Sequence, residues 1–211
     1  MTGIRGVGKT TTARIIAKAL NCIGDGTNKE PIFDICNVCS SCISINKGNF
    51  LDVIEVDAAS RTGVDGIREI IDSVMYSPNN GRYKVYIIDE VHMLSTNAFN
   101  AFLKTLEEPP KHCIFILATT EKHKIIPTIL SRCQIFDFKR ITVADAKNYL
   151  KLIAKEQGVE ADDDALHIIA QKSDGAMRDA LSIFDRVVSF SGAKLTRQAV
   201  AENLNVLDYD V

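Results

Sequence analysis

The feature that most constrains this chain is its N-terminal glycine-rich segment, Gly3-Ile4-Arg5-Gly6-Val7-Gly8-Lys9-Thr10. This G-x-x-x-x-G-K-T pattern is typical of a phosphate-binding loop that opens a helix. Glycines let backbone N–H groups converge on phosphate oxygens, and the helix N-terminus adds the positive end of its dipole. We therefore expect Lys9 to reach the β- and γ-phosphates of a nucleotide, and the Thr10 hydroxyl to bind Mg²⁺. The nucleotide-binding residues predicted from this segment are Gly3, Arg5, Gly6, Val7, Gly8, Lys9, Thr10 and Thr11.

A second pattern is typical of nucleotide hydrolysis: the apolar run Val85 to Ile88 ends in the adjacent carboxylates Asp89 and Glu90. In phosphate-loop proteins the carboxylates at such a strand end bind Mg²⁺ and orient the attacking water. Asp89 is predicted to hold the metal through water, and Glu90 to polarise the nucleophilic water as a general base. A pair of ordinary exposed acids is the alternative, which the phosphate-binding loop disfavours.

The next apolar run ends in Thr119 and Thr120. A hydroxyl at this position would contact the γ-phosphate or the catalytic water. Taken alone, the pattern is better explained by ordinary strand-end threonines.

Hydrophobic periodicity predicts strands that alternate with helices. Helices are expected at 10–20, 66–75 and 96–107, and strands at 50–56, 83–88 and 113–118, with 135–138 as a further candidate strand. This alternation predicts an α/β fold with a parallel sheet and crossover helices. After Arg140, three helices are expected at 142–157, 162–173 and 177–189, opened by Thr142 and by Asp162 to Asp164. We therefore predict a first domain over 1–140 and a helical domain over 141–211.

The polar segment 22–48 interrupts this pattern and carries four cysteines: Cys22, Cys36, Cys39 and Cys42. Two successive C-x-x-C steps with a fourth thiolate upstream predict a closed, structural zinc site. A redox C-x-x-C pair and an iron–sulfur cluster are the alternatives. The other two cysteines, Cys113 and Cys133, are expected to be small buried apolar residues, and His92 is expected to be structural.

Composition limits the remaining possibilities. The formal net charge is -2, which argues against wholesale wrapping by nucleic acid and makes any DNA contact local. The sequence contains no apolar run of membrane-spanning length and no secretory signal pattern. We expect a cytoplasmic protein without a membrane partner.

Taken together, the motifs resemble the gamma/tau subunit family of the bacterial DNA polymerase III clamp loader, which are AAA+ ATPases. The resemblance covers nearly the whole chain. Its motifs are Gly6 to Arg14, the four cysteines, Asp89 to Leu94, Leu103 to Pro110, Ala118 to Glu121 and Ser131 to Cys133.

The resemblance assigns further roles. Thr120, rather than Thr119, is similar to the sensor-1 residue, and Arg132 to the arginine finger that reaches the γ-phosphate held by a neighbouring subunit. Arg178 is similar to the sensor-2 residue, which links the γ-phosphate to the angle between domains. Ordinary surface ion pairs are the alternative for both arginines.

The function implied is that of an ATPase motor subunit within the DNA polymerase III holoenzyme, which loads the sliding clamp onto primed DNA. The implied cofactors are ATP, Mg²⁺ and structural Zn²⁺. The implied partners are the other clamp-loader subunits, the clamp and the primed DNA. The alternatives are a non-catalytic scaffold like the delta-prime subunit of the same complex, and another AAA+ remodeller.

The sequence departs from the family at its ends. Met1 and Thr2 alone precede the glycine-rich loop, so the strand that delivers this loop in the family is expected to be missing and to leave a slot in the sheet. We therefore expect a truncated chain with impaired or absent nucleotide binding. The family's collar domain is also expected to be absent, and the difference between gamma and tau products lies beyond residue 211.

Overall fold

The computed structural model describes residues 1–26, 28, 30–60, 64–192 and 194–204. They form two compact units. The first unit holds Met1–Gly3 and Lys9–Asp137, and the second holds Ile4–Gly8 and the described residues from Phe138 onward. The glycine-rich loop is thus shared between the two units.

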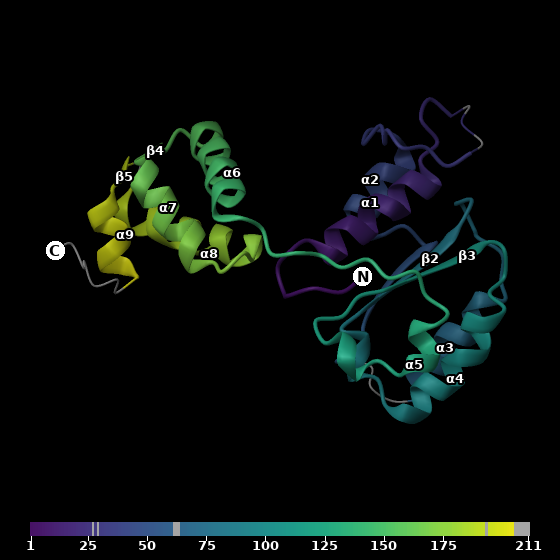
Figure 1. Cartoon of the computed structure of the whole chain (residues 1–211). Helices are drawn as coiled ribbons and strands as arrows, with labels where there is room; N and C mark the ends of the chain where they lie inside the picture. Colours follow the sequence, from purple (N-terminus) through teal and green to yellow (C-terminus); the bar gives the residue numbers. More distant parts are fainter. Residues whose placement is uncertain (27, 29, 61–63, 193, 205–211) are drawn as a thin grey trace. The chain divides into compact units, whose positions relative to one another are not determined.

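The first unit contains a parallel sheet in the order β1-β2-β3, formed by Val53–Asp57, Lys84–Asp89 and Cys113–Leu117 (Figure 1). Val53 lies opposite Val85, and Val85 lies opposite Ile114. The middle strand β2 is covered on both faces, and its residues Val85 to Ile88 are fully buried. This explains its continuous apolar run, which is typical of the inner strands of parallel sheets. The predicted parallel sheet flanked by helices is confirmed.

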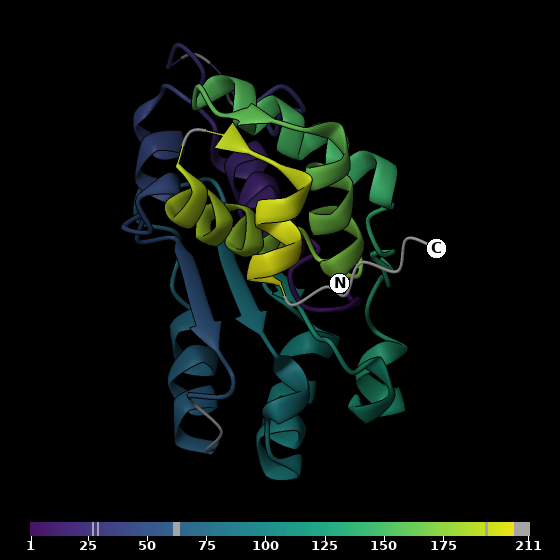
Figure 2. The ribbon, with the colours of Figure 1, turned by 90° about the vertical axis from the view of Figure 1, so that its left-hand side faces the viewer.

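Helices cover both faces of this sheet (Figure 1). Val85 and Ile87 pack against α1 on one face, whereas Tyr86 and Ile88 join the core with α3 and α4 on the other. Figure 2 shows α3 and α4 side by side. The helices are α1 (Lys9–Asn21), α2 (Ser40–Asn46), α3 (Val64–Val74), α4 (Thr96–Glu107) and α5 (Pro127–Leu130), with 3-10 turns at Val91–Met93 and Lys122–Lys124.

Strand β1 begins at Val53, three residues after the start that the sequence predicted. The preceding Asp52 is buried, and its carboxylate accepts hydrogen bonds from the backbone N–H groups of Asn79 (2.7 Å), Asn80 (2.7 Å) and Gly81 (2.6 Å). Burial by itself raises the pKa of Asp52, but these three donors and the charge of Lys84 outweigh it and hold the pKa below its usual value. This residue therefore fastens the loop before β2 to the loop before β1.

The N-terminal residues lie between β3 and the segment around Asp137. The Met1 ammonium donates to the Leu117 carbonyl (2.8 Å), and Thr2 forms isolated parallel bridges with Thr119 and Asp137. The strand predicted at 135–138 is therefore wrong: among the described residues, this segment has a bridge at Asp137 and no longer ladder.

A cavity of about 400 Å³ lies beside β3. It is lined by Met1, Ile16, Leu106, Pro109, Cys113, Ile114, Phe115, Ile116, Leu117, Arg132, Cys133, Gln134 and Phe136.

The second unit is largely helical around its own apolar core. Its helices are α6 (Val143–Glu156), α7 (Asp163–Lys172), α8 (Met177–Ser191) and α9 (Arg197–Asn203), with a short parallel pair, β4 (Glu160–Ala161) and β5 (Lys194–Leu195). The first three helices match the prediction, and the Thr142 hydroxyl caps α6 by accepting from the Asp145 N–H. The sequence missed α9, because seven residues are too short for a clear helical period. The described helices include none with the length and apolar character needed to cross a membrane.

Candidate functional site

The two predicted magnesium ligands meet in the first unit. Thr10 lies in the first turn of α1 and Asp89 ends β2, and the Thr10 hydroxyl donates to Asp89 Oδ2 at 2.7 Å. A hydroxyl and a carboxylate are the oxygen ligands that Mg²⁺ accepts, and this ion retains most of its waters. The pair therefore fits a hydrated Mg²⁺ that is bound by the Thr10 hydroxyl and held by Asp89 through water.

Lys9 is buried, with 6% of its surface exposed, and its ammonium donates to the Gly3 carbonyl at 2.8 Å. The N–H of Gly3 in turn donates to the Thr119 carbonyl at 3.3 Å. The predicted phosphate-binding lysine is thus held against the first residue of its own loop, beside the end of β3. A buried ammonium needs such a partner, because an unpaired charge in the interior is costly.

The loop residues Ile4–Gly8 pack against the start of α8 within the second unit. The backbone N–H of Arg178 donates to the Gly6 carbonyl at 3.3 Å. Gly6 has a φ of +81°, and a Cβ there would lie 3.1 Å from Arg178 Cβ. The backbone conformation at this position therefore favours glycine, and a side chain here would also be in tight contact with Arg178. Arg5 and Arg178 are exposed, as is Thr11 on α1, whereas Val7 and Gly8 are half-buried.

Glu90 follows β2 in a left-handed conformation, with φ +46° and ψ +43°. Its Oε2 accepts hydrogen bonds from the Thr120 hydroxyl (3.0 Å) and the Thr120 N–H (3.3 Å). Of the two threonines that the sequence offered, Thr120 is therefore the one that contacts Glu90. The Thr119 hydroxyl lies 2.9 Å from Nδ1 of His92. Left-handed backbone is uncommon outside glycine, and it occurs often at functional sites.

From the sequence, His92 was expected to have only a structural role. Its ring contacts Glu90, Thr119 and Glu121, so it belongs to the group of side chains around the predicted general base. The signal available in the sequence was its position two residues after Glu90, within the turn that leaves the strand.

Arg132 is exposed and pairs with Glu107 at the end of α4. Within the described residues, the structure gives it no contact with Thr10, Asp89 or Glu90. In this chain Arg132 therefore forms a surface ion pair, which is the alternative to an arginine finger.

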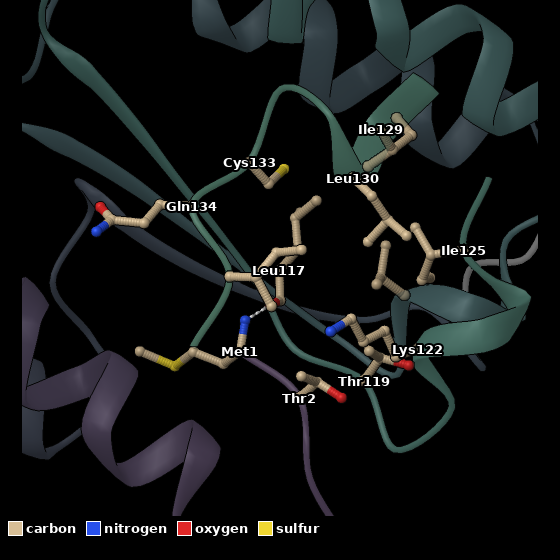
Figure 3. A pocket seen from close by; sticks show the side chains of 12 residues that line it. Met1, Thr2, Leu117, Thr119, Lys122, Ile125, Ile129, Leu130, Cys133 and Gln134 are labelled. Atoms are coloured by element: carbon tan, nitrogen blue, oxygen red, sulfur yellow. Dashed lines mark hydrogen bonds between the residues drawn. The ribbon is translucent and has the colours of Figure 1, made fainter. Parts of the chain in front are cut away.

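A small pocket lies beside Met1, with Leu117 and Cys133 in its wall and Thr119 and Lys122 at its polar edge (Figure 3). Its volume is about 40 Å³. Sites for organic ligands have volumes on the order of 300 Å³ or more, so this pocket is too small to hold a nucleotide.

The four predicted zinc ligands converge. The sulfur atoms of Cys22, Cys36, Cys39 and Cys42 all lie within 4.8 Å of one another. Cys22 Sγ is 3.5 Å from that of Cys36 and 3.9 Å from that of Cys39. Tetrahedral zinc with Zn–S bonds of about 2.3 Å separates its sulfurs by about 3.8 Å, so this set fits one zinc ion. The six cysteines are all free thiols.

The thiols are electrostatically unequal. Burial raises the pKa of Cys39, but hydrogen bonds from the N–H groups of Cys42 and Ile23 and from neighbouring thiols outweigh it and lower the pKa to about 6. Burial raises the pKa of Cys42 to about 12, helped by the thiols of Cys39 and Cys22. A metal cation at the centre would favour the thiolate form of every member, because zinc binds thiolates.

The cysteine segment is fastened to the sheet by Arg82, which lies just before β2. Its guanidinium donates to the carbonyls of Leu20 (3.0 Å), Asn28 (2.7 Å) and Cys22 (2.8 Å). Arg82 therefore connects the end of α1 and one of the four clustered cysteines to the start of the central strand.

Comparison with protein families gives two matches that together span most of the chain. Residues 1–142 match the family described as "DNA polymerase III, delta subunit". Residues 145–193 match "DNA polymerase III clamp loader subunit, ATPase lid domain".

Curated relatives agree with these matches. The chain is 56% identical over 190 residues to DNA polymerase III subunit tau of Bacillus subtilis, covering 90% of this chain and 33% of that protein. It is 45% identical over 208 residues to DNA polymerase III subunit gamma of Buchnera aphidicola (subsp. Baizongia pistaciae), covering 99% of this chain and 55% of the relative. The chain thus spans about a third and about half of the lengths of these relatives.

Among solved structures, the chain is similar to the Holliday junction branch migration motor RuvB of Thermotoga maritima, with a TM-score of 0.66 at 20% identity. The match covers 99% of this chain and 61% of that one. At this identity the likeness concerns the fold.

Proposed function

Because this chain belongs to the gamma/tau family of DNA polymerase III clamp-loader subunits, we propose that it is the ATP-driven motor region of such a subunit. In this proposal ATP binding favours the state that holds the sliding clamp and primed DNA, and hydrolysis releases them. The full-length subunit acts in the cytoplasm as an ATPase within the polymerase holoenzyme, together with the other clamp-loader subunits.

The observation that carries the proposal is the contact of Thr10 with Asp89 at 2.7 Å, next to Glu90 and Thr120. When bound, Mg²⁺ would neutralise phosphate charge at the Thr10–Asp89 pair. Glu90 is positioned to accept a proton from water, and Thr120 fixes one of its oxygens. Lys9 supplies the cation for the β- and γ-phosphates.

Two residues complete the proposed mechanism. Arg132 is the arginine finger for a neighbouring subunit, which supplies positive charge in trans and makes hydrolysis depend on assembly. Its exposure supports this role, since Glu107 is a partner that a phosphate can displace. Arg178 is the sensor-2 residue, supported by its place at the start of α8 against the phosphate-binding loop.

We further propose that Cys22, Cys36, Cys39 and Cys42 hold a structural zinc ion, and that residues 1–140 and 141–211 are the nucleotide-binding and lid domains. The sulfur geometry supports the first point, and the two separate cores support the second.

A non-catalytic scaffold, like a delta-prime subunit, is the second candidate, favoured by the match of residues 1–142 to a delta-subunit family. A scaffold does not need Lys9, Thr10, Asp89 and Glu90, whereas a motor does. Another AAA+ remodeller is the third candidate, and for it the cysteine cluster has no assigned purpose. Nucleotide-dependent thermal stabilisation separates a motor from a scaffold.

The decisive experiment uses the full-length subunit that carries this sequence, assembled with its partner subunits. Lys9→Ala is expected to abolish ATP-dependent clamp loading, and Arg132→Ala to lower its rate at least about 10³-fold. Lys111→Ala, at an exposed site before β3, is the matched control and should load clamps normally. Normal loading by the Lys9 or Arg132 variant would refute the motor mechanism.

The impaired nucleotide binding expected for the chain itself stays a prediction. Its measurement is the Kd for a fluorescent ATP analogue, with the full-length subunit as the comparison. An equal Kd for the two proteins would refute it.

A further inference from the structure

His92 is almost enclosed: 7% of its side chain is exposed, although it lies in a short turn after β2. Both of its ring nitrogens face partners. Nδ1 lies 2.9 Å from the Thr119 hydroxyl and 3.3 Å from Glu90 Oε2, and Nε2 lies 3.1 Å from Glu121 Oε2. A buried ring with both nitrogens occupied has a fixed orientation.

The partners determine where the ring hydrogen lies. Glu121 is held as an acceptor by Lys124, whose ammonium lies 2.6 Å from the same oxygen that faces Nε2. The hydrogen bond and charge of Lys124, with the nearby His92 and His123, lower the pKa of Glu121. A carboxylate only accepts hydrogen bonds, so Nε2 carries the hydrogen and donates it to Glu121.

The other edge of the ring then lies against Glu90. With the hydrogen on Nε2, Nδ1 accepts from the Thr119 hydroxyl, and the ring packs beside Glu90 Oε2, the oxygen that accepts from Thr120. Thr119 is fixed in turn, because its oxygen accepts from the Glu121 N–H at 3.0 Å. None of the described groups donates to the other oxygen of Glu90, Oε1.

We propose that His92 is a positioning residue for Glu90: its ring, anchored on Glu121, fixes Oε2 on the side of Thr119 and Thr120 and leaves Oε1 directed to the attacking water. This inference rests on the proposed ATPase function. His92 itself transfers no proton to the substrate. It acts by limiting the rotation of the Glu90 side chain, whose backbone already has a left-handed conformation.

The contact is tested first without any activity, by NMR of the chain labelled with ¹⁵N in histidine. Glu121→Gln is expected to shift the Nε2 resonance of His92, and Glu90→Gln its Nδ1 resonance. Glu107→Gln, which changes an exposed carboxylate paired with Arg132, is the matched control and should shift neither. An unchanged Nδ1 resonance of His92 in the Glu90→Gln variant would overturn the proposal.

The second test measures steady-state ATP hydrolysis by the assembled full-length subunit. His92→Ala is expected to lower kcat about tenfold, because loss of a residue that orients a functional group typically costs at least about tenfold in activity. KM should change less than about twofold. His92→Asn places an amide near the Nδ1 position, and His92→Gln places one near Nε2. Asparagine is therefore expected to restore more of kcat than glutamine.

The outcomes are separable. A kcat within about twofold of the wild type in His92→Ala, or a change in KM alone, overturns the positioning role, because a group that acts in the transition state must change kcat. Equal rescue by asparagine and glutamine also overturns it. If the wild-type assembly hydrolyses no ATP, the proposed function fails, and the NMR experiment still decides the contact between His92 and Glu90.

Discussion

Single residues hold several turns of this protein in place, and Asp52 is an example with a measurable consequence. Its buried carboxylate accepts three backbone hydrogen bonds from the loop before β2. Asp52→Ala would remove the shared acceptor of these N–H groups, two of which belong to the exposed residues Asn79 and Asn80, at about 1–3 kcal/mol for a lost hydrogen-bond partner. We predict a loss of about 1–3 kcal/mol in the free energy of unfolding, measured by urea denaturation at pH 7.

The pH dependence of Asp52 has a definite sign. Its pKa in the folded protein lies below the unfolded value, so its contribution is complete above the ordinary value of about 3.8 and is lost as the pH falls through the folded pKa. The difference in the free energy of unfolding between wild type and Asp52→Asn should therefore become smaller below about pH 4. A difference that stays constant from pH 7 to pH 3 would contradict this account.

Two glycines of the second unit allow the stability cost of backbone strain to be distinguished from the cost of steric crowding. Gly175 (φ +80°) and Gly158 (φ +68°) both have left-handed backbone. A Cβ at Gly175 would lie 2.6 Å from Arg140 Cβ, whereas one at Gly158 would meet nothing within 4 Å. Gly158→Ala should cost about 1–2 kcal/mol from backbone strain alone. Gly175→Ala should cost at least about 1 kcal/mol more, because crowding adds to the strain. Equal losses in thermal unfolding would show that the structure relaxes freely around Gly175.

At the level of elements, we predict that the cysteine segment depends on a bound metal ion. Helix α2 has seven residues, and Cys39 caps it by accepting from the Cys42 N–H. A helix this short is not stable on its own, so its formation requires tertiary or metal contacts. We predict about one zinc per chain by elemental analysis, and loss of zinc and of part of the helical signal in Cys36→Ser. Cys133→Ser should keep its zinc, since Cys133 lies outside the cluster.

The anchoring of this segment by Arg82 gives a kinetic prediction. Arg82→Ala removes two hydrogen bonds to carbonyls of the segment and one to the carbonyl of Leu20 at the end of α1. Local opening should therefore be easier, and zinc should pass faster to a chelator. We expect an increase of about tenfold in the release rate, corresponding to about 1.4 kcal/mol. Lys111→Ala is the control, and an unchanged rate in Arg82→Ala would show that these bonds do not limit opening.

At the level of the whole molecule, the two units have separate apolar cores. One core surrounds β2, with Ile88 fully buried, and the other contains Leu166, also fully buried. Each large-to-small substitution in a core costs about 2–5 kcal/mol. We predict that calorimetry resolves two transitions, of which Ile88→Ala lowers the Tm of one and Leu166→Ala that of the other. A single transition lowered equally by both variants would show that the units unfold together.

Much of the fold was readable from the sequence. The phosphate-binding loop, the inner strand β2 and the helix Thr96–Glu107 have strong local signals: glycine spacing, an unbroken apolar run and amphipathic periodicity. The short helix α9 and the bridge at Asp137 do not, because two to seven residues carry too little periodicity to be recognised. The cysteine spacing predicted four convergent thiols, and the sulfur positions agree.

The sequence by itself determined which residues are the candidates for chemistry, because Lys9, Thr10, Asp89, Glu90 and the cysteines belong to motifs with characteristic spacing. Tertiary structure alone decided how they are held. His92 and Glu121 are 29 positions apart along the chain, and they meet because β2 and β3 are adjacent and parallel, so the turns after both strands lie at the same edge of the sheet. Such pairings depend on strand order and register, which local sequence patterns do not encode.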